Sequence, residues 1–159
     1  MITTPIKEDG LLIHAVNAAT SVFTPEEVEC VDELWDENQA EGPENSGYYF
    51  IVDKEDGQIM GYTCYGPRAL TDRTYDLYWI AVDPPYAGQG IGTHLLQRIE
   101  ELVLAANGRL IVIETSSSSE YAAPRQFYLK NGYNLAETIR DFYRDGEDRV
   151  TYVKRVEDC

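Results

Sequence analysis

The N-terminal third of the chain alternates between apolar and polar residues at helical spacing. Residues 2–6 predict a short strand, and residues 9–20 predict a first helix. A second helix is predicted to begin at Thr24, because Thr24 can cap it, Pro25 suits its first turn and Glu27 can complete a capping box. Its apolar positions, which recur every three or four residues until a polar stretch ends the helix, are Val28, Val31, Leu34 and Trp35.

The rest of the chain alternates strand-like and helix-like segments. The run Leu110–Ile113 is continuously apolar, which is typical of a strand that is buried on both faces and parallel to a neighbour. The fold class is therefore α/β, more narrowly an α+β mixed sheet that is mostly antiparallel, with a central parallel βαβ unit and helices on both faces. The predicted elements are strands 48–52, 58–65 and 75–82, a helix at 91–106, a strand at 109–115, a helix at 124–130 and a closing hairpin of strands 133–142 and 149–156.

Length and charge narrow the classes of function. A chain of 159 residues fits one domain, 1–159. Aspartate and glutamate number 28 against 13 lysines and arginines, a net charge of −15, and residues 1–57 hold 14 acidic and 2 basic side chains. We therefore expect neither nucleic acid nor an anionic membrane as a partner, because both need a basic surface. The acidic surface favours a cationic partner or substrate, or serves solubility alone.

Cysteine and histidine usage indicates location and metal content. Cys30, Cys64 and Cys159 are scattered, and an odd count with no secretory signal at the N-terminus predicts reduced thiols in the cytoplasm. No apolar run approaches the length of a membrane span. With only His14 and His94 and no clustered cysteines, we expect no metal site.

A glycine-rich turn between strand 75–82 and helix 91–106 is the strongest chemical signal. Gly88, Gly90 and Gly92 alternate there. Unpaired N–H groups at the start of a helix carry partial positive charge, and glycines let an anion such as phosphate come close. The alternative is a tight turn with no ligand. The spacing fits neither the GxGxxG fingerprint nor a P-loop.

Two segments resemble motifs of the GNAT superfamily, the acyl-CoA-dependent N-acetyltransferases. Residues 78–84 (YWIAVDP) and 87–93 (AGQGIGT) resemble motif A of that family, Arg/Gln-x-x-Gly-x-Gly/Ala. Residues 125–133 (RQFYLKNGY) are similar to its Phe-Tyr-x-x-x-Gly-Phe/Tyr signature. The order of predicted elements agrees with the family over roughly residues 2–156. The resemblance implies the acyl-CoA N-acyltransferase fold, a transferase (acyltransferase) activity and acetyl-CoA as the co-substrate, with no metal.

The resemblance also implies roles for particular residues. The backbone of Ile80, Ala81 and Val82 pairs with the pantetheine arm, and Tyr128 binds near the thioester sulfur and protonates the departing thiolate. A core position in a short helix is the alternative for Tyr128. The turn that holds the pyrophosphate consists of Ala87, Gly88, Gln89, Gly90, Ile91, Gly92 and Thr93. Its first residue is Ala87, where the family motif has Arg or Gln. Many members also have Asn where this chain has Tyr121.

The reaction needs a neutral amine, and deprotonating a lysine-like ammonium at pH 7 costs roughly 4.6 kcal/mol. Asp76 lies where several family members have a catalytic Glu, so it is a candidate base acting through water. It could instead bind a backbone amide or pair with an arginine. Glu114 follows four apolar residues, and it is a second candidate, as base or as anchor for the substrate ammonium. Its alternative is a structural pair with Arg109 or Arg125.

The expected acceptor is the primary amine of a small molecule, such as an amino acid like D-alanine, which is attacked directly in a ternary complex. The alternatives are a non-catalytic acyl-CoA-binding or regulatory module, and acetylation of a protein N-terminus or lysine. Family members are often dimers, so a homodimer is an expected state that the hydrophobic pattern does not require. The residues expected to frame the acceptor pocket are Tyr62, Tyr65, Arg68, Asp141, Phe142 and Tyr143.

Overall fold

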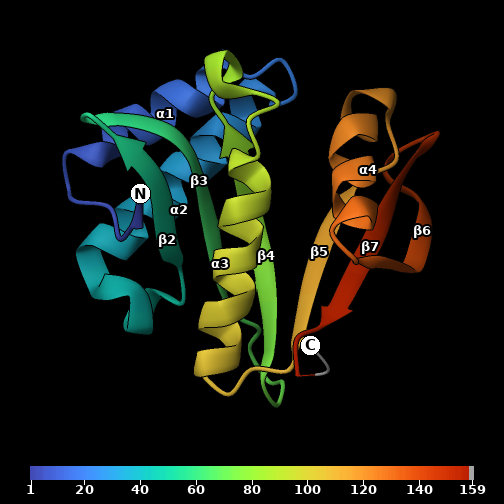
Figure 1. The fold of residues 1–159 in the computed structure, drawn as a ribbon. Coiled ribbons are helices and arrows are strands. Elements are labelled where there is room, and N and C mark those ends of the chain that lie inside the picture. The colour runs from blue at the N-terminus through green and yellow to red at the C-terminus, as the bar shows by residue number, and fades with distance from the viewer. Residues whose placement is uncertain (158–159) are drawn as a thin grey trace. The chain divides into compact units, whose positions relative to one another are not determined.

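A computed structural model describes residues 1–157 (Figure 1). Its strands pair in the order β1-β2-β3-β4-β5-β7-β6, with one parallel pair, which confirms the predicted mixed sheet. The elements in chain order are β1 (Ile2–Thr3), α1 (Asp9–Ala19), α2 (Pro25–Ser46), β2 (Tyr49–Glu55), β3 (Gln58–Pro67), β4 (Thr74–Val82), the 3₁₀ turn η1 (Pro84–Tyr86), α3 (Ile91–Ala105), β5 (Leu110–Ser116), the 3₁₀ turn η2 (Ser119–Tyr121), α4 (Ala122–Lys130), β6 (Asn134–Arg144) and β7 (Glu147–Arg155).

The described chain forms two compact units, and β4 and α3 each contribute to both. The N-terminal unit contains Met1–Gly66 and Tyr78–Glu101. The C-terminal unit contains Pro67–Leu77 and the chain from Leu102 onward. The division into two compact units does not test the expectation of a single domain over 1–159, which stays a prediction.

In the N-terminal unit, α1 and α2 cover one face of the sheet and α3 covers the other (Figure 1). An added Cβ on Gly61 of β3 would come 2.9 Å from the Ala81 carbonyl oxygen and 3.0 Å from the Ile91 side chain, so only glycine lets α3 pack this closely. The next side chain, Tyr62, points to the opposite face. It belongs there to a core made of Ile13, Val16, Val31, Trp35, Phe50, Val52, Ile59, Tyr62, Cys64 and Ala81.

The long helix α2 begins as the sequence predicts. Thr24 Oγ1 accepts a bond from the Glu27 N–H at 3.2 Å, and Glu27 Oε1 accepts one from the Thr24 N–H at 3.3 Å, which completes the capping box. The predicted polar end, residues 38–46, is instead helical except for a kink. Gly42 has φ +80° there, and the proline that follows it suits the first turn of a new helical segment.

The C-terminal unit confirms the predicted parallel pair. Thr74–Asp76 of β4 lie in register with Leu110–Val112 of β5. β7 pairs antiparallel with β5 and β6, and every residue of the edge strand β6 is exposed. The turn at Asp145-Gly146 closes the predicted hairpin, with Gly146 at φ +82°.

Several sequence predictions need smaller corrections. The strand expected at residues 2–6 covers only Ile2–Thr3, and β3 continues through Pro67 instead of ending before it.

Cys30 and Cys64 are free thiols, whereas Cys159 lies outside the described residues. Within residues 1–157, none of the helices has the length and apolar character that crossing a bilayer requires. In the same part of the chain, His, Cys, Asp and Glu side chains do not gather in threes as metal ligands would.

Candidate active site

The turn from β4 into α3 presents a run of unused backbone donors. After Val82 the Asp83 N–H bonds to the Met60 carbonyl at 2.8 Å, which holds the start of the turn against β3. The helix begins with a bond from the His94 N–H to the Gly90 carbonyl at 3.0 Å. In the described structure, the N–H groups between these points, from Gly88 to Thr93, donate no hydrogen bond.

Glycine is required in this turn by its backbone angles. Gly88 has φ +77° and Gly90 has φ +80°, a region that residues with a Cβ seldom adopt. A Cβ built at either position would meet nothing within 4 Å, so the space beside the turn is open. Both residues are exposed to solvent, as Ala87 and Gln89 also are.

The donor set fits a multiply charged anion. Six consecutive N–H groups at Gly88–Thr93 share the positive end of a 15-residue helix. Residues 84–93 carry no charged side chain, so no carboxylate repels an anion within the turn and no Lys or Arg supports it. The turn can therefore bind a diphosphate through its backbone alone.

Tyr128 lies on α4 in an aromatic cluster of the C-terminal unit. Its ring centroid is 5.6 Å from that of Phe127, 6.4 Å from that of Tyr133 and 6.0 Å from that of Tyr152. The side chain is 7% exposed, and this burial raises the pKa of the Tyr128 phenol. The hydroxyl therefore stays protonated at neutral pH, so it can donate a proton but cannot act as a base.

Asp76 and Glu114 are brought together by Arg68. Arg68 Nε donates to Asp76 Oδ2 at 3.0 Å, and its Nη2 donates to Glu114 Oε1 at 2.8 Å. Asp76 is 8% exposed, and burial raises its pKa although the Arg68 guanidinium offsets part of the rise. The structure therefore shows the expected alternative, in which Asp76 pairs with an arginine. The role of Asp76 as a base stays a prediction.

Glu114 differs from its predicted setting. It is exposed, whereas the other residues of β5 are buried or half-buried, and neither Arg109 nor Arg125 binds it. Those arginines bind main-chain carbonyls, with Arg109 Nε 2.8 Å from the Asp72 oxygen and Arg125 Nη1 2.7 Å from the Ser116 oxygen.

The second cation at Glu114 is Arg149 of β7, which sequence reasoning missed. Its Nη1 lies 3.7 Å from Glu114 Oε2, and its Nη2 donates to Glu137 Oε1 at 3.1 Å. The guanidinium carbon is 4.6 Å from the centroid of the Phe142 ring. Arg68, Asp76, Glu114, Arg149 and Glu137 thus form one charged network in the C-terminal unit.

The residues expected to frame an acceptor pocket differ from one another in burial and in contacts. Tyr62 is fully buried and donates to Asn17 Oδ1 at 2.7 Å, so it belongs to the core and was wrongly assigned to a pocket wall. Tyr65 is 7% exposed and stacks on Tyr49. The hairpin residues are exposed, with Phe142 and Tyr143 in edge-to-face contact beside Asp141.

Comparisons with known sequences point to one family. Residues 14–133 match the model described as the acetyltransferase (GNAT) family. A Methanocaldococcus jannaschii protein described as an uncharacterized N-acetyltransferase is 32% identical over 107 residues, which are 67% of this chain and 65% of that protein. An N-alpha-acetyltransferase from Sulfurisphaera tokodaii is 30% identical over 140 residues, covering 74% of this chain and 83% of that one. The chain therefore spans just under two thirds of the M. jannaschii relative.

Comparisons with solved structures agree. A Desulfovibrio desulfuricans protein described only as a GNAT-family acetyltransferase has a TM-score of 0.95 and 39% identity, with 98% of both chains covered. A Salmonella typhimurium acetyltransferase solved with acetyl-CoA shares the fold, with a TM-score of 0.75 and 19% identity over 98% of this chain and 93% of that one. The glycine turn, the matched residues 14–133 and the close structural likeness lead to one conclusion: this chain belongs to the GNAT family of acetyltransferases.

Proposed function

We propose that the protein transfers an acetyl group from acetyl-CoA to the primary amine of a small molecule, by direct attack in a ternary complex. The observation that carries the proposal is the run of six unused N–H donors at Gly88–Thr93. A dinucleotide-like diphosphate is the part of acetyl-CoA that such a turn can bind. When bound, acetyl-CoA supplies a thioester, which is an activated acyl group.

The chain offers further residues to hold the co-substrate. The backbone of Ile80, Ala81 and Val82 would bind the pantetheine arm, and the turn from Ala87 to Thr93 would bind the diphosphate. Ala87 has no hydrogen-bonding side chain, so the backbone donors carry the electrostatic attraction. Gln89, two residues after Ala87, is exposed in the same turn, and its side-chain amide could add a contact to the diphosphate.

The proposed acid is Tyr128 and the proposed base is Asp76. As the carbon–nitrogen bond forms and the carbon–sulfur bond breaks, the Tyr128 hydroxyl gives its proton to the thiolate sulfur. The Asp76 carboxylate takes the proton that leaves the amine nitrogen, through a water molecule. Burial supports the Asp76 assignment, because it raises the pKa of that carboxyl and makes it a stronger base than an exposed aspartate. The Tyr128 phenol is protonated at neutral pH and so has a proton to donate. Glu114 shares Arg68 with Asp76 and is the alternative base or the anchor for the substrate ammonium.

The charges of the chain bear on the class of acceptor. D-alanine or a similar amino acid would need a cation for its carboxylate, and Arg68 already binds two carboxylates, which does not support that subclass. A second acceptor class is the α-amine of a polypeptide. The acidic surface of the N-terminal unit favours it, and the S. tokodaii relative is named an N-alpha-acetyltransferase.

A thiol-release assay tests the proposal. The purified protein is mixed with acetyl-CoA and with either a panel of small primary amines or a panel of peptides with free N-termini, and free CoA thiol is followed with time. We expect turnover with at least one amine and none without an acceptor. Calorimetry that detects CoA binding, together with no turnover on either panel, would overturn the proposal in favour of a non-catalytic acyl-CoA-binding module.

A further inference from the structure

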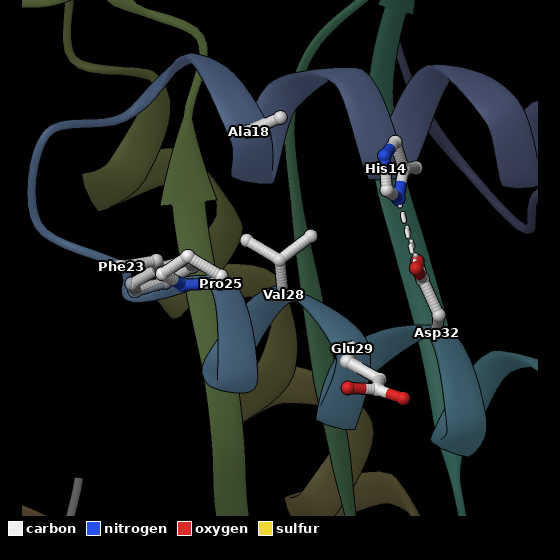
Figure 2. A pocket seen from close by; sticks show the side chains of 7 residues that line it. All are labelled: His14, Ala18, Phe23, Pro25, Val28, Glu29 and Asp32. Atoms are coloured by element: carbon white, nitrogen blue, oxygen red, sulfur yellow. Dashed lines mark hydrogen bonds and ion pairs between the residues drawn. The ribbon is translucent and has the colours of Figure 1, made fainter.

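A groove lies between α1 and α2 in the N-terminal unit (Figure 2). Its volume is about 340 Å³. We call it the α1–α2 groove, and its walls are His14, Ala18, Phe23, Pro25, Val28, Glu29 and Asp32.

One part of the groove is apolar. Val28 is 9% exposed, and the Phe23 ring meets Trp79 of β4 edge to face at a centroid distance of 5.3 Å. Ala18 and Pro25 complete this surface between the two helices (Figure 2). It can therefore hold an aliphatic or aromatic group.

The other part of the groove is anionic. His14 Nδ1 lies 2.8 Å and 3.1 Å from the two oxygens of Asp32, which fixes the position of that carboxylate. Glu29 comes from the same face of α2, and no residue of the described chain forms an ion pair with it (Figure 2). A cation beside an apolar group would meet both kinds of wall.

The charge around the groove extends far beyond it. α2 carries nine acidic side chains and no lysine or arginine, from Glu26 to Glu44. The stretch from Glu26 to Glu41 alone is about 22 Å long at the rise of an α-helix. A small amine covers only a fraction of that length, whereas about seven residues of extended polypeptide match it. Charge complementarity therefore selects a basic polypeptide segment as the occupant.

We propose that the α1–α2 groove docks a basic segment of a polypeptide, with one aliphatic or aromatic side chain in the apolar part and flanking lysine or arginine side chains on Glu29, Asp32 and the α2 surface. That this polypeptide is also the acetyl acceptor rests on the second acceptor class of the proposed function, the α-amine of a polypeptide. Docking itself does not, and it is measured without acetyl-CoA.

The probe is a fluorescein-labelled peptide of about eight residues with a blocked N-terminus, in which one leucine is flanked by lysine pairs. Matched peptides replace the lysines by glutamine or the leucine by serine. Binding is followed by fluorescence anisotropy on the full chain. The double variant Glu29→Gln/Asp32→Asn removes the groove carboxylates, and Ala18→Phe fills the apolar part while leaving every carboxylate. Glu55→Gln/Asp56→Asn removes two exposed charges at the β2–β3 turn, outside α2, and is the matched control.

We expect both groove variants to raise the Kd of the lysine–leucine peptide about fivefold or more, and the matched control to change it less than about twofold. Melting temperatures verify that each variant is folded. The proposal is overturned if the glutamine peptide binds the wild-type chain equally well, if the control weakens binding as much as the groove variants, or if Ala18→Phe binds unchanged. Because the thiol-release assay is separate, loss of docking and loss of acetyl transfer are told apart.

Discussion

Replacing Gly90 by valine perturbs, at one backbone position, the turn that we propose binds the diphosphate. Gly90 has φ +80°, and its carbonyl accepts the bond from the His94 N–H that starts α3. A Cβ at this position meets nothing within 4 Å, so the substitution causes no clash and acts through backbone conformation alone. A β-branched residue avoids this region, and holding an L-residue in it costs about 1–2 kcal/mol.

The chain can relieve that strain by rotating the peptide groups beside residue 90. The N–H groups of Gly90 and Ile91 then no longer point toward the proposed diphosphate position. A net hydrogen bond to a charged group is worth about 1.5–3 kcal/mol, so the loss of one raises the Kd for CoA about 10- to 150-fold. The loss of both exceeds that range.

Isothermal titration calorimetry with CoA measures the effect. The matched control is Gly57→Val in the β2–β3 turn, where φ is +77° and an added Cβ also meets nothing within 4 Å. Both variants carry the same backbone strain, and only Gly90→Val should weaken CoA binding. Equal weakening in both variants, or a Kd for Gly90→Val within about twofold of the wild type, would refute the reasoning.

Three further predictions concern the reaction and the turn. Tyr128→Phe keeps the aromatic packing but removes the proposed proton donor, so steady-state kinetics should show kcat about a hundredfold lower and little change in the acetyl-CoA KM. For Asp76, burial raises the pKa, so kcat/KM should fall as pH drops through that raised pKa, and a pH–rate profile of Asp76→Asn should lack this acid limb. Ala87→Arg adds a cation to a turn that has none, so calorimetry should show CoA bound about two- to fivefold more tightly; an unchanged Kd would place the diphosphate elsewhere.

Features that depend on residues close together in the sequence were predictable from the sequence. The start of α2 follows from Thr24, Pro25 and Glu27, because a capping box needs only four consecutive residues. The parallel pairing of β4 with β5 follows from the apolar run Leu110–Ile113, because a strand without polar alternation must be covered on both faces. The family motif located the glycine turn for the same reason, since its chemistry is contained in one turn.

Features that depend on sheet order were not predictable. Glu114 was expected beside Arg109 or Arg125, which are near in sequence, but β7 is placed next to β5 and brings Arg149 to it. Once that strand order is known, the register locates the contact, because Arg149 lies opposite Ser116, two residues from Glu114. The spacing along the chain holds no signal for that order.

The burial of individual side chains was also not predictable from the sequence. Tyr62 was expected on a pocket wall because a tyrosine suits a binding surface, but it alternates with Gly61 on β3 and faces α1 and α2. Asn17 accepts the bond from its hydroxyl within the core, which satisfies that hydroxyl without solvent. A strand pattern gives the alternation but does not say which helix covers which face. The roles given to Asp76, Glu114 and Tyr128 stay predictions.

The backbone amides of Gly88–Thr93 can be observed one by one. Amide chemical shifts of isotopically labelled protein, recorded during titration with CoA and with pantetheine, which lacks the diphosphate, report on each N–H directly. CoA should shift the proton resonances of these six amides downfield, and pantetheine should leave them in place. CoA that binds while these six resonances stay unmoved would contradict the claim that the turn holds the diphosphate.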